Sequence, residues 1–371
     1  MRSAFFMNIQ HLTLSDFRNL EKVDIAPDSG FNIFWGVNAQ GKTNLLEAVY
    51  LLGNLKSFRG ARNEEMIRHG TELSHLKGDM VCQGIRRRIE LHIDFHGKKG
   101  RVDGKESRST GSFLGHLRPI LFSPEEVNLI KGSPAGRRDL LDRAVFQADT
   151  AFLGRAQEYR RLLRQRNCLL RENRGREEIQ PWSEGLIITG ARIRQDRVLY
   201  LDRLLPLLRE AYRNIAGGRE EADIQYSAGA SSVEKMEEAL RRELERSEDR
   251  ERKMGQTLAG PHRDDPRFMV DGRLLRLYGS QGQQRSFILA FKAAQIMDLE
   301  DITGEPPILL LDDMTSELDR QRQGFFFRFL QARQGQVFIT TTDIRSLIDE
   351  GFRQARFYRV SGGVVEEDCR E

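Results

Sequence analysis

The chain has 371 residues, of which 39% are hydrophobic and 31% charged, so it carries enough apolar material for a sizeable core. No apolar run approaches the roughly 18 residues that cross a bilayer, and the opening MRSAFFMNIQ has too short an apolar stretch for a secretory signal, which excludes a membrane-spanning class. Three widely separated cysteines exclude a disulfide framework and a cysteine-based metal site, so we expect a reducing, cytoplasmic location.

Arginine dominates the basic residues. The net charge is +4, and the 59 basic residues comprise 11 lysines and 48 arginines. Residues 151–214 alone contain 14 arginines and no lysine, against eight acidic residues. Arginine binds phosphates and carboxylates in a bidentate manner, so this segment is compatible with nucleic-acid binding. A solvated helical surface explains the same charges, and both interpretations stay open.

The first third of the chain shows strand patterns around one helix. Apolar and polar residues alternate through residues 7–35, which predicts short strands, and a helix is expected from Gly41 to about Leu55. Strict alternation over 88–95, a turn-rich HGKKG segment and a return near Val102 then predict a half-exposed antiparallel hairpin.

The rest of the chain changes from helical to mixed character. Helical spacing of apolar residues predicts a helical block over 125–210, broken near 175–181. The later elements are expected in this order: a polar helix at 232–253, a hairpin at 267–274, a buried helix at 286–299, an apolar strand at 308–311, another helix, and a strand at 337–340.

This order predicts one α/β domain that is interrupted by a helical insertion. We expect the N-terminal part of an α/β lobe at 1–118, a helical lobe at 119–254, and the C-terminal part of the α/β lobe at 255–371.

The segment GVNAQGKT, which runs from Gly36 to Thr43, lies between a strand pattern and a helix pattern. Gly36 and Gly41 let the backbone curl so that its N–H groups face a phosphate. Lys42 is placed to neutralise the β- and γ-phosphates, and Thr43 supplies a hydroxyl to Mg²⁺. The N-terminus of the following helix also favours an anion. The segment therefore predicts a binding loop for ATP with Mg²⁺.

Two carboxylates follow the apolar strand ILLLDD near residue 310. A buried strand of an open α/β sheet delivers such groups to its carboxyl end, where ligands bind. Asp312 is therefore expected to hold Mg²⁺ through water. Asp313 is expected to orient the attacking water or to accept its proton.

A second anion site is expected at YGSQGQQ, residues 278–284, which we call the signature segment. It lies between the hairpin at 267–274 and an apolar helix. Ser280 and Gly282 place a hydroxyl and free N–H groups at the start of that helix. The chain therefore has two expected anion sites, of which only the first is a nucleotide loop. We expect the signature segment to close over the γ-phosphate of a nucleotide that a partner molecule holds.

Several short motifs together carry a family resemblance. The nucleotide loop, then Ser-x-Gly-Gln before a helix, then Leu-Leu-Leu-Asp-Asp is the order of ABC-type ATPases. The chain resembles, over nearly its whole length, the RecF family of bacterial recombination mediators, in these segments: Phe17-Arg18-Asn19, Lys56-Ser57-Phe58-Arg59, Phe122-Ser123-Pro124-Glu125, Gly260-Pro261-His262-Arg263-Asp264-Asp265 and Ser316-Glu317-Leu318-Asp319.

The resemblance implies an ABC-type ATPase head with a P-loop α/β lobe and an inserted helical lobe. It implies that ATP drives head-to-head dimerisation on DNA and that slow, DNA-stimulated hydrolysis releases the dimer. The implied role is recombinational repair and replication-fork maintenance, with support of the SOS response. The implied partners are duplex DNA at single-strand gap junctions, RecR, and RecO and RecA downstream, with RecA loaded at the gap.

The resemblance also assigns roles to individual residues. Lys42 and Asp313 are the implied catalytic residues, Thr43 and Asp312 the metal ligands, and Asp319 lies at the dimer seam. The implied nucleotide-binding residues are Arg18, Gly36, Asn38, Gly41, Lys42, Thr43, Asn44, Ser280, Gly282 and Gln283.

The sequence departs from the broad ABC-type pattern near the reacting phosphate. Asp313 stands where a glutamate is usual and is one methylene shorter. Thr342 stands near the position of the usual switch histidine, and no convincing glutamine is found around Ser123 to Glu125. The shorter side chain of Asp313 and a weaker proton acceptor predict slow ATP turnover. Slow turnover suits a protein that uses ATP to stay bound better than one that uses ATP to move.

DNA is expected over the joined α/β lobes of the dimer, partly from the resemblance to related heads and partly from charge. Glycine- and lysine-rich loops with little apolar content suit phosphate contacts and carry no pattern for reading bases. The expected contacts are Lys56, Arg59, Arg62, Lys98, Lys99, Arg101 and Lys105. The competing surface is the arginine-rich stretch 155–171, which also fits a solvated or partner-facing helix.

Four other classes of protein fit the sequence less well. A transporter subunit would need a membrane partner and would not be expected to carry FRN and KSFR. A chromosome-structuring ATPase would need long heptad arms, and the insertion is too short for them. A small-molecule kinase would need no signature segment. A purely architectural DNA binder would not need Lys42, Asp312 and Asp313 together.

Overall fold

The computed structural model describes residues 6–228, 232–314 and 319–368. The chain forms two compact units. Residues 1–126 and 299–371 make one, which we call the sheet unit, and residues 127–298 make the other, the helical unit. Each is described separately below.

These boundaries differ from the expected ones at 118 and 254, and the pairing of strands explains why. β8 (Pro119–Phe122) pairs in parallel with β12 (Ile308–Asp312), so it belongs to the sheet unit. β10 (Arg267–Val270) pairs with β9 (Ala222–Gln225), which ties the region after residue 254 to the helical unit.

A six-stranded sheet in the order β15-β14-β3-β13-β12-β8 forms the base of the sheet unit. All neighbours are parallel except the edge strand β15. The remaining members are β3 (Phe31–Trp35), β13 (Val337–Thr341), β14 (Arg356–Ser361) and β15 (Val364–Glu367). The predicted strands of this sheet are confirmed. Three strands of this sheet, β8, β14 and β15, were not predicted from the sequence.

An antiparallel sheet in the order β2-β1-β4-β5-β6-β7 completes the unit. Its strands are β1 (Asn8–Phe17), β2 (Leu20–Ile25), β4 (Leu73–Cys82), β5 (Ile85–Asp94), β6 (Lys98–Val102) and β7 (Lys105–Glu106). The predicted hairpin is β5–β6, and its alternation gives one buried face and one polar face.

Helix α1 (Lys42–Asn54) contacts strands of both sheets, and most of its residues are buried. It therefore lies between the two sheets and places the nucleotide loop at their junction. The other helices wholly in the sheet unit are α2 (Asn63–Met66), α3 (Thr110–Phe113), α12 (Arg320–Gln331) and α13 (Ile344–Asp349).

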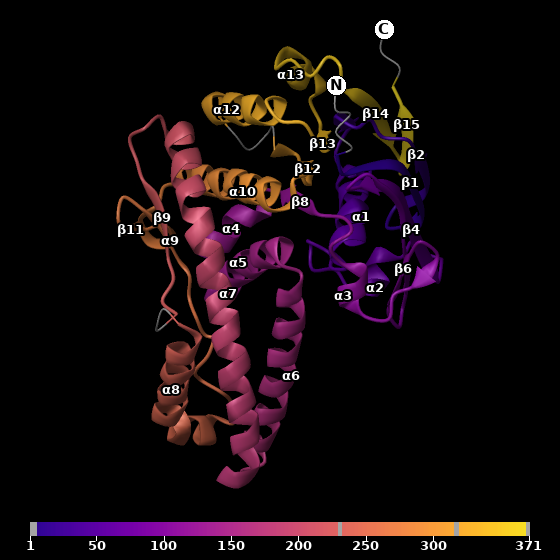
Figure 1. Ribbon diagram of the computed structural model, residues 1–371. Helices are drawn as coiled ribbons and strands as arrows, with labels where there is room; N and C mark the ends of the chain where they lie inside the picture. The colour runs from indigo at the N-terminus through magenta and orange to yellow at the C-terminus, as the bar shows by residue number, and fades with distance from the viewer. Residues whose placement is uncertain (1–5, 229–231, 315–318, 369–371) are drawn as a thin grey trace. The chain divides into compact units, whose positions relative to one another are not determined.

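The helical unit is built around two long helices, α6 (Ala151–Arg171) and α7 (Arg176–Ala216), which run side by side (Figure 1). Its other elements are α5 (Pro134–Ala148), α8 (Val233–Met254), β11 (Arg273–Leu274) and α9 (Leu275–Tyr278). Helices α4 (Glu125–Lys131) and α10 (Gln281–Thr303) cross the unit boundaries.

The expected break in the helical block is shorter than predicted. The chain leaves helix only between Arg171 and Arg176, and Pro181 lies inside α7. Pro206 lies inside the same helix, and each of the two prolines removes one backbone hydrogen bond without ending the helix.

Several arginines of residues 151–214 are internal rather than solvated. Arg194 and Arg197 are almost fully buried and bind the carboxylate of Asp264, with Arg194 Nη2 2.7 Å from Asp264 Oδ1. Arg166 forms an ion pair at 2.7 Å with Glu251, whose side chain is fully buried. Breaking such a pair on one side costs about 3–5 kcal/mol. These three arginines therefore hold the helical unit together, whereas most of the other arginines of residues 151–214 are exposed.

Among the helices of the described ranges, none has the length and apolar character that crossing a membrane requires.

Candidate nucleotide-binding site

The nucleotide loop connects β3 to α1 and depends on two glycines. A Cβ added at Gly36 would lie 2.3 Å from the Val360 carbonyl oxygen on β14. Gly41 has φ +116°, and a Cβ there would lie 2.9 Å from Leu20 Cδ2. A side chain at Gly36 would clash with the backbone of β14, and the positive φ of Gly41 would strain any residue other than glycine, so both glycines favour the curled loop.

Lys42 lies at the first turn of α1 and points back into the loop. Its ammonium donates to the carbonyl oxygens of Gly36 at 2.7 Å and Val37 at 2.8 Å, and the residue is only 7% exposed. Burial lowers the pKa of Lys42, whereas the carboxylates of Asp313 and Asp312 oppose that shift. A cation is thus held at the centre of the loop, where an anion would sit.

Three oxygen-bearing side chains converge beside this lysine. Asp312 Oδ1, at the end of β12, accepts hydrogen bonds of 2.8 Å from the hydroxyls of Thr43 and Thr340. Burial raises the pKa of Asp312, although these two hydrogen bonds lower it. Hard oxygen donors of this kind match the preference of Mg²⁺. The chain thus brings together Lys42, Thr43 and Asp312, as the sequence predicted.

Asp313 is held by its backbone beside this cluster. Its φ of 45° is unusual for a residue other than glycine, and its N–H donates to the Thr340 hydroxyl at 3.0 Å. Glu125, in the segment where no glutamine was found, is near enough for its charge to raise the pKa of Asp312. Neither Thr340 nor the side chain of Glu125 was predicted from the sequence to be part of this site.

One buried carboxylate joins two of the family motifs. Glu47 on α1 is fully buried and accepts two hydrogen bonds from the Arg18 guanidinium, at 3.0 and 2.9 Å. It also accepts the Ser57 hydroxyl at 2.5 Å. FRN and KSFR therefore meet at Glu47, a residue that sequence reasoning missed. Its signal was a lone glutamate in the apolar helix pattern NLLEAVYLL.

Arg18 was expected to contact the nucleotide. Its Nη1 also donates to the Glu65 carbonyl oxygen at 2.8 Å, so the described contacts of its guanidinium are with protein groups. Direct nucleotide contact by Arg18 stays a prediction.

Asn19, the last residue of FRN, forms hydrogen bonds that stabilise the nucleotide loop. Its side-chain amide donates to the Gln40 carbonyl oxygen at 3.1 Å, and its Oδ1 accepts from Asn44 at 2.7 Å. Asn44 in turn accepts a hydrogen bond from Arg59 at 3.2 Å. Asn38 is exposed in the loop, and its carbonyl oxygen accepts from Gln40.

We predict that Glu47→Ala destabilises the sheet unit. The change leaves the Arg18 charge without its carboxylate partner and the Ser57 hydroxyl without its acceptor, which costs about 3 kcal/mol or more and lowers the Tm by roughly 5–10 °C for a unit of this size. Thermal unfolding of the full chain measures it, with exposed Glu64→Ala as the control. An unchanged Tm in Glu47→Ala would contradict the structural role of this carboxylate.

The signature segment lies in the helical unit, at the start of α10. Ser280 Oγ accepts from the Gln283 backbone N–H at 3.1 Å, and Gln283 Oε1 accepts from the Ser280 N–H at 2.9 Å, a capping box. Gln283 also donates to Glu220 at 2.9 Å. Ser280 is exposed and Gly282 half-buried, and the neighbouring Leu277 and Tyr278 are 60% and 69% exposed.

Asp319 is exposed and caps α12, with its side chain accepting from the Arg322 N–H at 3.0 Å. The preceding Ser316, Glu317 and Leu318 of that motif lie outside the described residues.

The two basic segments expected to meet DNA lie next to each other in the sheet unit. The Lys98 ammonium donates to the Leu55 carbonyl oxygen at 2.8 Å, which joins β6 to the segment after α1. Lys98 is thereby turned inward, and burial lowers its pKa. The other six residues of the set are exposed: Lys56, Arg59, Arg62, Lys99, Arg101 and Lys105.

The chain is similar over nearly its full length to proteins named DNA replication and repair protein RecF. It is 52% identical over 357 residues to that of Syntrophotalea carbinolica, covering 96% of this chain and 98% of the relative. It is 43% identical over 363 residues to that of Geobacter sulfurreducens, covering 97% and 99%. No family model matches the chain.

Solved structures give the same similarity. The recombination mediator protein RecF with ATP, of the RecFOR pathway, superimposes with a TM-score of 0.88 at 32% identity, over 98% of this chain and 99% of that chain. The Smc head domain of Pyrococcus furiosus gives a TM-score of 0.57 at 14% identity, over 98% and 96%, which shows a shared fold alone.

Proposed function

Because this chain belongs to the RecF family of DNA replication and repair proteins, we propose that it is an ATP-dependent DNA-binding protein of recombinational repair. In this proposal, bound ATP joins two copies on DNA and slow hydrolysis separates them. Family membership confirms the resemblance drawn from the motifs, and the ABC-type ATPase fold is confirmed with it. Nothing in the comparisons favours a transporter subunit or a chromosome-structuring protein.

The observation that carries the proposal is the convergence of Thr43, Asp312 and Thr340 beside Lys42. Lys42 offers a buried cation to phosphate oxygens, and Thr43 and Asp312 offer oxygen ligands to Mg²⁺, directly or through water. Bound Mg²⁺ would neutralise charge on the phosphates of ATP. The hydrogen bonds between these side chains already hold their oxygen atoms in one place.

Hydrolysis in this proposal relies on Asp313. The Thr340 hydroxyl accepts the Asp313 N–H and donates to Asp312, so one buried side chain fixes both aspartates. Asp313 orients the attacking water and accepts its proton. An aspartate reaches less far than the glutamate usual in ABC-type ATPases, so we infer slow turnover, stimulated by DNA.

Dimerisation in this proposal uses the signature segment of the partner copy. The exposed capping box at Ser280 and Gln283 offers a hydroxyl and helix N–H groups to the partner's γ-phosphate. Leu277 and Tyr278 beside it are largely exposed, as is Val37 at 70% in the nucleotide loop. Large apolar side chains are thus exposed both at the nucleotide loop and at the signature segment, and such exposure is typical of a surface that is covered in an assembly.

We further propose that the dimer acts at junctions between duplex and single-stranded DNA in the cytoplasm, where RecR and RecO help it to load RecA and to support the SOS response. This part rests on family membership and not on contacts in the structure.

The test of the proposed function is binding to duplex DNA, with and without ATP, across a salt series. Wild type is expected to bind only with ATP. We expect the pair Arg59→Glu and Arg62→Glu to weaken binding at least about ten-fold and to reduce the log–log salt slope by about 0.9 per lost phosphate contact. The control pair is Arg160→Glu and Arg164→Glu, on the exposed side of α6, which should bind like wild type.

ATP binding by each variant is measured in parallel because Arg59 also contacts Asn44 beside the nucleotide loop. If only the control pair loses DNA binding, the DNA-binding surface lies on the helical unit and not on the sheet unit. No loss in either pair would show that the basic residues serve protein partners, and ATP-independent binding would overturn the proposed function itself.

A further inference from the structure

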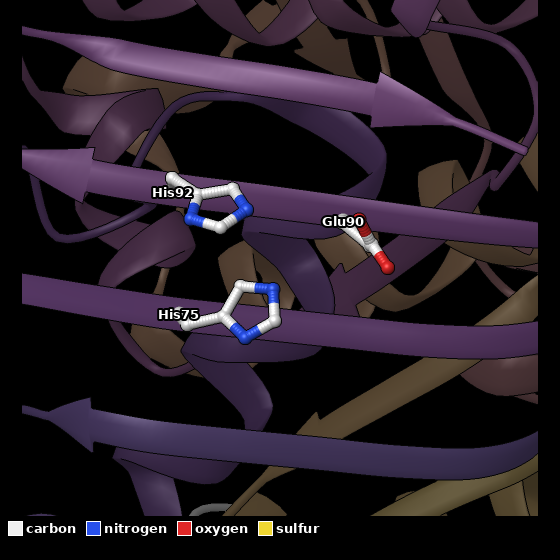
Figure 2. Close-up of side chains that lie close together, drawn as sticks. All are labelled: His75, Glu90 and His92. Carbon is white, nitrogen blue, oxygen red and sulfur yellow. The ribbon is translucent and has the colours of Figure 1, made fainter. Parts of the chain in front are cut away.

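Two histidines and a glutamate meet on the polar face of the antiparallel sheet. His75 on β4 and His92 on β5 are direct cross-strand partners, and Glu90 precedes His92 by two residues. Residues two apart on a strand share a face, so all three side chains project from the same side. Figure 2 shows the two imidazole rings on neighbouring strands, with the Glu90 carboxylate beside them and one nitrogen of each ring on the side nearest to it.

The spacing of the three side chains suits a metal ion. One ligand atom from each residue lies within 4.8 Å of the other two. Some point is therefore within about 2.8 Å of all three atoms, against the roughly 2.0–2.1 Å of zinc–nitrogen and zinc–oxygen bonds. An inward shift of less than about 1 Å by each side chain, which rotation about side-chain bonds provides, would complete the contacts. Among the described residues, this is the one group of histidine, cysteine, aspartate and glutamate side chains with such spacing.

The histidines carry a polar atom that the protein itself leaves unsatisfied. The Nε2 atoms of His75 and His92 are both buried and have no hydrogen-bond partner. A buried polar atom without a partner costs about 1–3 kcal/mol. The rings stack with their centroids 4.3 Å apart, a distance at which two protonated imidazoles repel each other.

We propose that His75, Glu90 and His92 bind one divalent transition-metal ion, with zinc as the best fit. Two imidazoles and one carboxylate favour zinc or a similar ion over Mg²⁺, which prefers oxygen ligands alone. Three protein ligands leave one tetrahedral position for water. The site lies in the sheet unit and shares no residue with the nucleotide-binding site.

The cations around the site do not block it. Lys77 lies beside Glu90 across the strands and forms an ion pair with Asp79 at 3.6 Å. Arg101, the partner of Glu90 on β6, faces Glu106 on β7. Lys99, the partner of His92, is exposed to solvent. Lys77 and Arg101 thus each have an acidic neighbour, and the charge of Lys99 is screened by water.

The test is metal binding by the full chain, free of any histidine tag and of nucleotide, in excess Mg²⁺. Titration with Zn²⁺ against a chromophoric chelator should give one tight equivalent. Titration with Co²⁺ should give the visible absorption of a tetrahedral site. The variants His75→Gln, His92→Gln and Glu90→Gln should each bind Zn²⁺ at least about ten-fold more weakly, since even supporting residues of metal sites have effects of that size.

The controls are His69→Gln and His96→Gln, whose side chains are exposed and lie outside the cluster. They should bind Zn²⁺ like wild type. Thermal unfolding separates binding from folding, because Zn²⁺ should raise the Tm of wild type and of both controls but not of the cluster variants. Absence of a tight equivalent in wild type, or equal affinity in the cluster variants and the controls, would overturn the proposal.

Discussion

The Asp313→Asn variant is expected to hydrolyse ATP at least about 100-fold more slowly than wild type, as the loss of a general base predicts. The change keeps the size of the side chain and removes its capacity to accept a proton. Asparagine is also among the residues that best tolerate the positive φ found at this position, so the backbone held by Thr340 should persist. We therefore expect folding and ATP binding to be retained.

Turnover is measured as steady-state phosphate release, with and without duplex DNA. If Asp313 limits hydrolysis and not assembly, the variant should form an ATP dimer that stays on DNA longer than wild type. Asp301→Asn, at an exposed position of the same unit, is the control and should hydrolyse ATP normally. Faster release of Asp313→Asn from DNA would contradict the idea that hydrolysis ends the bound state.

Ser280→Arg is expected to abolish the ATP-dependent dimer while leaving ATP binding intact. Ser280 is exposed at the start of α10, where a partner's γ-phosphate is proposed to enter. An arginine there fills that space, and its cost to the free protein is mainly the lost helix cap, about 1 kcal/mol. Sedimentation velocity with and without ATP measures the effect, and binding of a fluorescent ATP analogue checks the protein's own nucleotide loop.

Two controls separate the causes of this effect. Ser280→Ala loses the same cap but leaves the space open, so it should retain a weakened dimer. Gln157→Arg adds the same charge at an exposed position of α6 and should dimerise like wild type. A Ser280→Arg protein that still dimerises on ATP would show that the signature segment does not act across two copies.

The sequence by itself determined the parts of this protein whose chemistry is local. The nucleotide loop, the strand ending in Asp312, the signature segment and the polar hairpin are contiguous patterns, because a phosphate-binding turn, a buried strand or a helix cap needs only neighbouring residues. The short motifs also identified the RecF family, which full-length similarity confirmed. In the sheet that carries the nucleotide loop, strands β8, β14 and β15 were not predicted, because such short patterns are ambiguous without the neighbouring strands.

The tertiary structure decided which distant side chains share a partner. Nothing in the sequence shows that Arg18 and Ser57 both bind Glu47, or that Thr340 holds both aspartates. It also turned Lys98 inward and buried Arg194 and Arg197 against Asp264. The pairing of His75 with His92 depends on the register of β4 and β5, and a shift by one residue would put the rings on opposite faces. Such contacts follow from strand register and helix packing over long sequence separations, where local patterns carry no information.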